Sequence, residues 1–437
     1  MHYRFVIIFL VFTSSTLYSQ QLTYKTVDSI TYSQFLNQKY EDLIDTAESA
    51  LYEDIDFFYL RMRLGIAYYS TTDYFNALPH FIKANQMNPA DTICQEYLFY
   101  SYVFTDRIEE SKLFADKLSK AMQNKINYKR NFIESVSLSY GYGYTKNLQE
   151  GKTKEITANR FIYAEASYQG PFHYVSGLVE QNVKNKLKLL YGMWYYNTQS
   201  MGAIQISNKV NYKEFKNNHY QYCLAASYYK KGWDVSLAGS YYVHNASSCF
   251  GMYDSNTNLY DFKTTETRIN SYAAVIGIGK RFNKIHPIVN IATSNFVNRI
   301  QVQTEGSVIF YPFWNSNLYT VTSVAYQNDD SENKFVFFQK LGSKVTKRLW
   351  VEESFSIGDH SNYVSKYAFL TYNTMEPVKI IVGIDFKYYF KHLEVDLGYR
   401  LQQLEGEYTY YDTPTVTKTK QYNYINHLTT ATLKWNF

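Results

Sequence analysis

The sequence predicts a membrane β-barrel of about sixteen antiparallel strands, preceded by a small all-α domain of tetratricopeptide repeats. Three observations support this fold class. Beyond Phe132 apolar and polar residues alternate with a period of two, whereas residues 24–123 show helical periodicity. The chain also holds 47 tyrosines and 29 phenylalanines among its 437 residues. A membrane barrel has use for so many aromatic residues, because tyrosine combines an apolar ring with a polar tip at the membrane interface.

The first segment, residues 1–19, has the pattern of a secretory signal peptide. Arg4 precedes an apolar run at residues 5–12, and Ser19 is the expected last residue before cleavage. The apolar run is too short to cross a membrane as a helix. We therefore expect an exported protein with a helical domain at residues 20–123, a linker at 124–131 and a barrel at 132–437.

The helical segment carries a tetratricopeptide pattern between residues 58 and 89. In such a repeat, small residues let two helices approach, large residues fill the space between repeats, and a proline ends the second helix. These positions are occupied by Leu64, Gly65, Tyr68, Ala77, Phe81, Ala84 and Pro89. Stacked repeats form a curved plate that either docks a partner or acts as a spacer, and the sequence leaves both roles open.

The strand that closes the barrel is predicted at the C-terminus, where Leu433, Trp435 and Phe437 alternate with polar residues. One face suits lipid and the other suits water, and the terminal aromatic residue would lie at the membrane interface. Many earlier segments alternate in the same way over about 10 residues or more, the length of a membrane-spanning strand. An even strand number places both ends of a barrel on one side. We therefore expect a barrel in the outer membrane with its helical domain in the periplasm.

Breaks in the alternation set the expected strand count. Short breaks, among them residues 170–171, predict periplasmic turns. Longer polar breaks, among them residues 213–218, 245–267 and 405–419, predict loops on the outside. Residues 359–377 follow no clean alternation. Together these breaks give a count of about sixteen strands, give or take two.

Charged residues at inward positions are candidates for lining the lumen. They are Glu165, Lys188, Lys379, Asp385, Lys387, Glu394, Asp396 and Arg400. Such residues could filter a polar or sugar-like solute, or they could pair with one another and fill the barrel. A pore for ions of one sign would show a ring of one charge, whereas this set mixes both signs.

Composition argues against several other classes of protein. The net charge is only +5 and forms no dense basic patch, so we expect no nucleic-acid partner. Cys94, Cys223 and Cys249 are scattered, which indicates neither a zinc site nor a disulfide framework. The stretch from Asp254 begins like a calcium loop but has Leu259 where glycine is needed. We expect no metal and no cofactor.

Catalytic motifs are also missing from the sequence. It contains no GxSxG motif and no phosphate-binding loop, and its nine histidines do not cluster with serine and aspartate. We therefore expect that the chain is not an enzyme. A surface enzyme with serine, histidine and an acid at the barrel rim is a third alternative, after the two given below.

The order of signal peptide, tetratricopeptide positions Leu64 to Pro89 and a terminal strand ending in KWNF resembles the YaiO-type outer-membrane barrel proteins. The layout is also similar to that of the porins that export cellulose or poly-N-acetylglucosamine, and the Ser-Gln ending of the signal peptide resembles exported proteins of the Bacteroidota. The resemblance implies a periplasmic repeat domain below an outer-membrane barrel. It assigns no functional residue.

Two hypotheses follow for the function. The first is an outer-membrane channel or translocation component whose repeats dock a periplasmic protein and whose barrel passes a polar polymer such as a glycan. The second is a non-conducting barrel that anchors a multiprotein assembly, with the repeats as adaptor. The two hypotheses differ in the lumen, because a pore needs an open path and an anchor does not.

Overall fold

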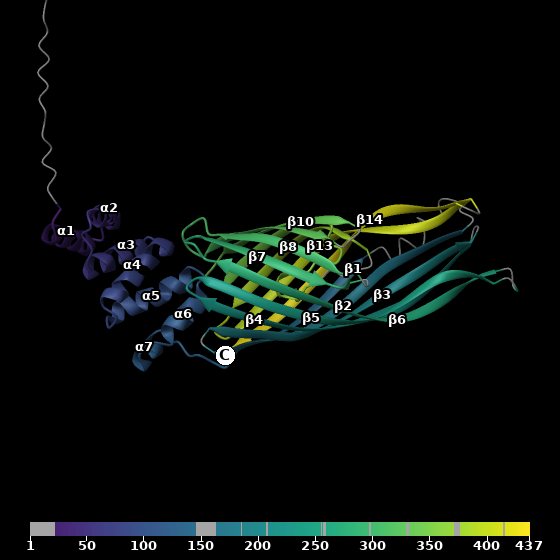
Figure 1. Cartoon of the computed structure of the whole chain (residues 1–437), viewed down its shortest axis with the longest axis horizontal. Coiled ribbons are helices and arrows are strands. Elements are labelled where there is room, and N and C mark those ends of the chain that lie inside the picture. Colours follow the sequence, from purple (N-terminus) through teal and green to yellow (C-terminus); the bar gives the residue numbers. More distant parts are fainter. Residues whose placement is uncertain are drawn as a thin grey trace, which may run out of the picture.

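The computed structural model describes residues 22–145, 163–184, 186–206, 209–254, 256, 259–296, 299–328, 332–370, 376–413 and 416–437. In this part of the chain seven α-helices precede a closed antiparallel barrel of fourteen strands (Figure 1). The helices are α1 (Tyr24–Leu36), α2 (Tyr40–Tyr52), α3 (Phe58–Ser70), α4 (Tyr74–Met87), α5 (Thr92–Phe104), α6 (Ile108–Ala115) and α7 (Lys120–Lys125).

Each strand of the barrel pairs with its neighbours in chain order. The strands are β1 (Ile133–Thr145), β2 (Tyr163–Lys184), β3 (Leu187–Ile206), β4 (Lys209–Lys230), β5 (Trp233–Asp254), β6 (Leu259–Lys280), β7 (Ile285–Ser294), β8 (Gln301–Phe310), β9 (Leu318–Asn328), β10 (Asn333–Lys344), β11 (Leu349–Gly358), β12 (Val378–Tyr389), β13 (Leu393–Thr413) and β14 (Val416–Asn436).

The ring is closed by β1 and β14, which pair from Ser135↔Asn436 to Thr145↔Asn426. The backbone N–H of Phe437 also donates to the carbonyl of Glu134 at 3.1 Å. The start of β1 and the end of β14 therefore lie at one end of the barrel, here called the proximal end. The helices lie next to this end (Figure 1). The opposite end is called the distal end.

The barrel has fourteen strands and not the central predicted number of sixteen, which places it at the lower limit of the predicted range. Residues 170–171 were expected to form a turn, but they lie inside β2, at a bulge between Gln169 and Phe172. Residues 213–218 were expected to form a loop, but they lie inside β4. A bulge tolerates glycine and proline without ending the strand, which explains the first error.

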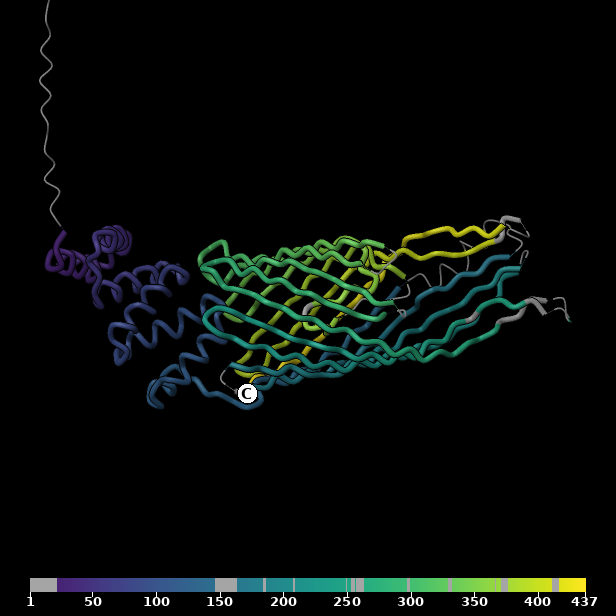
Figure 2. Tube along the Cα trace, viewed as in Figure 1, coloured from purple at the N-terminus to yellow at the C-terminus, as the bar shows by residue number. Residues whose placement is uncertain are grey.

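Most of the other predicted loops are also paired strand. Within residues 245–267, β5 runs to Asp254 and β6 begins at Leu259, and β13 and β14 take up most of residues 405–419. Strands β2 to β6 and β13 to β14 are 20 to 22 residues long, whereas β7 to β12 have 10 to 12. The long strands extend beyond the short ones at the distal end (Figure 2). Their polar distal halves therefore mark exposed sheet and not loops.

The outer surface of the barrel carries a belt of exposed apolar and aromatic side chains. Members of this belt include Leu138, Met193, Leu224, Leu237, Ile276, Ile291, Val324, Phe335, Val382, Leu397, Leu433 and Trp435, each at least 38% exposed. A soluble protein would cover so large an apolar surface, and a closed barrel with such a belt satisfies its backbone hydrogen bonds within the sheet. The fold is therefore that of outer-membrane β-barrel proteins.

No helix among the described residues is both long enough and apolar enough to cross a membrane.

The helical domain consists of antiparallel helix pairs with continuous buried cores. Between α3 and α4, Gly65 faces the buried ring of Phe81, and a Cβ atom at Gly65 would lie only 2.8 Å from Phe81 Cε1. The glycine therefore permits this close approach of the two helices. Helix α4 begins after Asp73, whose carboxylate accepts a hydrogen bond from the backbone N–H of Asn76 at 3.1 Å. The assignment of these pairs to the tetratricopeptide family stays a prediction.

Candidate functional site

The segment between β11 and β12 enters the barrel. Residues 359–370, here called the inner loop, contact inward side chains of β8 and β9, two to three places from β11 in the ring, and of β4 and β5 on the opposite wall. A short 3₁₀ turn, η3 (Lys366–Ala368), lies within the inner loop. These contacts make the inner loop a plug across the lumen, and it is the candidate functional site.

The carbonyl of Ala368 is the main anchor of the inner loop. It accepts hydrogen bonds from Gln221 Nε2 at 2.9 Å, from Ser240 Oγ at 2.7 Å and from Tyr242 OH at 3.1 Å. All four residues are buried. A buried backbone carbonyl needs such donors, because leaving it unsatisfied would cost as much as a lost hydrogen bond.

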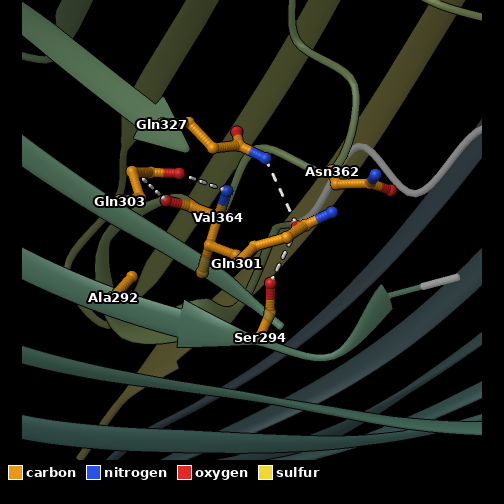
Figure 3. Close-up of a pocket in the computed structure, with 7 residues that line it drawn as sticks. All are labelled: Ala292, Ser294, Gln301, Gln303, Gln327, Asn362 and Val364. Atoms are coloured by element: carbon orange, nitrogen blue, oxygen red, sulfur yellow. Dashed lines mark hydrogen bonds between the residues drawn. The ribbon is translucent and has the colours of Figure 1, made fainter. Parts of the chain in front are cut away.

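A second anchor holds the middle of the inner loop (Figure 3). The amide of Gln303 donates to the carbonyl of Val364 at 2.8 Å and accepts from its N–H at 3.0 Å, as a strand partner would. Gln327 Nε2 donates to the carbonyl of Ser361 at 3.3 Å. The space between this part of the inner loop and the wall has no room for a water molecule. The plug is therefore packed directly against the wall.

Apolar packing accompanies these hydrogen bonds. Val364 and Ala368 join a buried cluster with side chains of the wall, four of them alanines, and Phe369 stacks on Trp194 with ring centroids 5.6 Å apart. The wall residues of this cluster are Ala225, Ala238, Tyr242, Ala273, Val275, Ala292 and Phe296. Alanines at inward positions leave the space that the inner loop occupies.

The backbone of the inner loop carries local strain. Asn362, Tyr367 and Ala368 have φ values of 61°, 62° and 56°, in the left-handed region that non-glycine residues rarely adopt. Such conformations persist only where the surroundings over-determine them, and they cluster at switch segments and ligand clamps. The inner loop is thus held in place by its partners and not by its own backbone preference.

The predicted lumen charges lie in several places, and five of the eight are in ion pairs. Arg400 Nη2 donates to both carboxylate oxygens of Asp385, at 2.9 and 3.0 Å. Lys387 and Lys340 bind the two oxygens of buried Glu352, at 2.8 and 2.9 Å. Opposite charges therefore meet within the wall, and this arrangement gives no ring of one sign.

Three further predicted residues have other partners. Lys379 pairs with Asp359, the first residue of the inner loop, at 2.8 Å. Glu165 accepts a hydrogen bond from the backbone N–H of Gly251 at 2.8 Å, on the long distal wall. Lys188 lies 2.7 Å from Glu180 at the proximal end. The predicted set is therefore spread over the full length of the barrel.

The remaining two predicted residues, Glu394 and Asp396, form no ion pair within the described residues. The Oδ1 atom of Asp396 is buried and has no hydrogen-bond partner there.

The helical domain is joined to the proximal end by hydrogen bonds and ion pairs. The N–H of Phe75 donates to the carbonyl of Trp314 at 3.2 Å, and the N–H of Ser316 donates to the carbonyl of Phe104 at 3.0 Å. Asp106 accepts from Tyr311 OH at 2.6 Å and pairs with Arg281 at 3.4 Å. Burial, together with the Asp106 carboxylate, raises the pKa of Tyr311. The turn between β8 and β9 is thus fixed to α4 and α5.

A chain of alternating charges makes a second contact between the helical domain and the barrel. Lys112 of α6 binds Glu134 at the start of β1, and Lys188 of β3 lies 3.5 Å from the same carboxylate. Glu180 of β2 binds both Lys188 and Lys434, the latter at 2.8 Å. This chain crosses the seam where β1 meets β14.

The helical domain contains one strongly perturbed histidine. His80 is 8% exposed, and its Nδ1 lies 3.0 Å from Arg61 Nη1. Burial, and then the Arg61 charge, lower the pKa of His80 to about 4. The Asp56 charge raises the pKa of His80, but burial outweighs this attraction.

A serine and a histidine meet near the inner loop. Ser356 Oγ lies 2.6 Å from His360 Nε2, while His360 Nδ1 faces the carbonyls of Val378 and Gly358, at 2.9 and 3.1 Å. Ser356 and His360 are 5% and 1% exposed, so a substrate has no access to them. The pair fixes the start of the inner loop. The absence of enzymatic activity stays a prediction.

Among the described residues, no three histidine, cysteine, aspartate or glutamate side chains gather closely enough to hold a metal ion.

The sequence alone did not indicate the residues that hold the inner loop. Gln221, Gln303 and Gln327 occupy inward positions of β4, β8 and β9, and residues 359–377 are distinguished in the sequence only by their lack of alternation. A long connection without alternation, opposite inward amides and alanines, was the available signal. This signal can be interpreted only when the pairing of the strands shows that those amides lie at one level of the barrel.

No protein-family model matches the chain, and a search of curated proteins gives no match. Among solved structures, the toluene transporter TodX of P. putida is similar, with 7% identity, a TM-score of 0.43 and coverage of 70% of this chain and 91% of that one. A FadL homologue of Pseudomonas aeruginosa has 8% identity, a TM-score of 0.43 and coverage of 70% and 90%. A bacterial polysaccharide outer-membrane secretin has 9% identity, a TM-score of 0.33 and coverage of 71% and 100%.

Proposed function

We propose that this chain is an outer-membrane channel that is closed at rest by the inner loop. The observation that carries the proposal is the inner loop itself, which crosses a lumen with polar inward side chains and is held by replaceable hydrogen bonds. A permanent filling would need no strained backbone at Tyr367 and Ala368. A gate benefits from a strained backbone, because strain lowers the free energy needed to leave the docked position.

The cargo that we propose is a polar and largely uncharged polymer such as a glycan. Amides are numerous among the buried inward residues, including Gln221, Gln301, Gln303, Gln327, Gln402, Asn290 and Asn426. Amides both donate and accept hydrogen bonds, which suits hydroxyl groups. The charged residues of the wall are mostly paired and so offer little attraction to an ion.

The helical domain would bind a periplasmic protein and report its presence to the gate. Strands β8 and β9 carry Gln303 and Gln327, which hold the inner loop, and the turn that joins these strands is bonded to α4 and α5. A partner that shifts the helices would therefore act on the strands that anchor the plug. We place this domain in the periplasm.

Conductance in a planar bilayer tests the channel. We expect the purified full chain to show rare, brief openings, and a variant in which residues 361–370 are replaced by a short Gly/Ser linker to conduct steadily. Heat-modifiable migration in gel electrophoresis would establish that the variant barrel is folded. If the folded variant passes no current at any voltage, the chain is not a channel.

The second candidate function is a non-conducting anchor for a multiprotein assembly. The observation that favours it is that the inner loop crosses the lumen and that the helical domain is hydrogen-bonded to the proximal end of the barrel. Absence of current from the linker variant would favour this function. A single assembly or glycan-synthesis protein recovered with the full chain from periplasmic extract would name the partner in either case.

A further inference from the structure

The lipid-facing belt contains one acidic side chain. Glu353 is the fifth of the ten residues of β11 and points outward with its neighbour Phe355, which is 39% exposed. Because β11 spans the belt with only ten residues, Glu353 lies near its middle. Within the described residues, no other Asp, Glu, Lys or Arg points outward at this depth, and Glu353 forms no ion pair.

Polar neighbours accompany Glu353 on the same outer face. Glu353 pairs in register with Leu341 of β10, and Gln339 lies two residues along, opposite Phe355. Thr322 of β9 donates a hydrogen bond to Gln339 Oε1 at 2.7 Å. This contact orients the amide of Gln339 and leaves its Nε2 with only a long contact, 3.5 Å, to the carbonyl of Lys340. We call Thr322, Gln339 and Glu353 the polar patch.

A groove of about 500 Å³ lies along the same wall. Gln339, Leu341, Glu353 and Phe355 line one side of it, and Tyr399 and Leu401 line the other. Its outward residues otherwise belong to the apolar belt, so it would be filled by lipid chains or by another protein. A carboxylate in contact with lipid chains alone is unfavourable, and ionisable side chains within membranes rarely face lipid without a polar partner.

We propose that two copies of this chain associate through the polar patch and the adjoining groove. The patch is self-complementary, because one face holds an acceptor, Glu353, and a donor, Gln339, whose Nε2 makes only one long hydrogen bond within the described part of the chain. A two-fold axis between β10 and β11 brings Gln339 of each copy to Glu353 of the other, which gives two equivalent hydrogen bonds. The apolar side chains that line the groove, Leu341 and Phe355 among them, then pack against those of the other copy.

A second copy fits this surface better than a basic partner does. A basic side chain would satisfy Glu353 but would leave Gln339 without an acceptor, whereas the two-fold pair satisfies both groups. Hydrogen bonds of this kind strengthen an association in lipid, where water does not compete for them.

Oligomeric state and crosslinking test the proposal. Native mass spectrometry of the full chain in lipid nanodiscs is expected to show a dimer. Glu353→Leu and Gln339→Leu are each expected to weaken the dimer at least tenfold, and Glu353→Gln, which keeps an acceptor, is expected to weaken it less. Ile276→Ala, at an exposed position of the belt on β6, is the matched control and is expected to change nothing.

Single cysteines give an independent measurement in native membranes. In a background with Cys94, Cys223 and Cys249 changed to serine, Leu341→Cys is expected to form a dimer of this chain on oxidation, and Ile276→Cys is not. A monomeric wild type in nanodiscs, or a dimer that survives both leucine variants, would overturn the proposal. Crosslinking of Leu341→Cys to a different protein, or a lipid that the wild type retains and Glu353→Leu loses, would overturn it as well.

Discussion

The hydrogen bonds to the carbonyl of Ala368 allow the gate to be weakened without changing its shape. Ser240→Ala together with Tyr242→Phe removes two hydroxyl donors, at 2.7 and 3.1 Å, and keeps Gln221 as the third. A net hydrogen bond contributes about 1 kcal/mol, so the double variant should destabilise the docked loop by about 2 kcal/mol. That free energy corresponds to a shift on the order of 30-fold in the ratio of docked to undocked loop.

Single-channel recording of the purified full chain measures this ratio directly. The open probability of the double variant should rise on the order of 30-fold over that of the wild type, with the same conductance per opening. Equal conductance is expected because the substitutions weaken the closed state and leave the open path unchanged. Ser323→Ala is the matched control. It removes a buried serine hydroxyl of β9 that bonds Ser307 of β8 at 2.8 Å, and the Ser323 hydroxyl itself makes no hydrogen bond to the inner loop.

Two results would refute this reasoning. If Ser323→Ala raises the open probability as much as the double variant does, the effect reflects general loosening of the barrel. If the folded double variant and the wild type show the same rare openings, the carbonyl of Ala368 does not hold the gate. In the second case the inner loop would be a fixed part of the wall.

Three further predictions concern the helical domain. Burial holds the pKa of His80 near 4 in the folded domain against 6.5 in the unfolded chain, so the unfolded chain binds the extra proton. The free energy of unfolding should therefore fall between pH 6.5 and pH 4, by up to roughly 3 kcal/mol. Helix melting followed at 222 nm measures this change. Gly65→Ala should destabilise the same transition by about 1–3 kcal/mol, because its Cβ would lie 2.8 Å from the ring of Phe81. Tyr311→Phe should weaken the docking of the domain by about 1.5–3 kcal/mol, since it removes a bond to the Asp106 carboxylate, and should speed hydrogen exchange at the end of α5.

Each of these three predictions has its own control. His80→Gln should flatten the pH dependence, and an unchanged slope would show that another group titrates. Phe81→Leu should recover part of the loss in Gly65→Ala, and additive losses would contradict a direct clash. Tyr388→Phe, at an exposed position of β12, should leave hydrogen exchange in α5 unchanged.

The sequence predicts the barrel well because closure of a sheet in lipid imposes a strict period of two. The terminal strand illustrates this, since Leu433 and Trp435 are 51% and 48% exposed as their alternation indicates. The number of strands predicted from the sequence differs from the observed number for a physical reason. Polar residues beyond the membrane remain in paired strands, because a neighbouring strand satisfies the backbone as well as water does.

The inner loop lies beyond this kind of reasoning, because its position is set by contacts between distant residues. Its backbone polar groups are bonded to amides and hydroxyls of β4, β5, β8 and β9. The separations along the chain are 34 residues for Ser361 and Gln327, 61 for Val364 and Gln303, and 148 for Phe369 and Gln221. Each of these amides alone would equally suit an open, water-lined pore.

The balance between a gate and a permanent filling therefore depends on how the inner loop is held. Permanent fillings of barrels use side chains of the wall itself, as the paired Asp385 and Arg400 do here. The inner loop instead places its own backbone, with Tyr367 and Ala368 in the left-handed region, against donors of the opposite wall. Such contacts are individually weak and are exchangeable for water or for hydroxyl groups of a cargo, which is the property that a gate requires and an anchor does not.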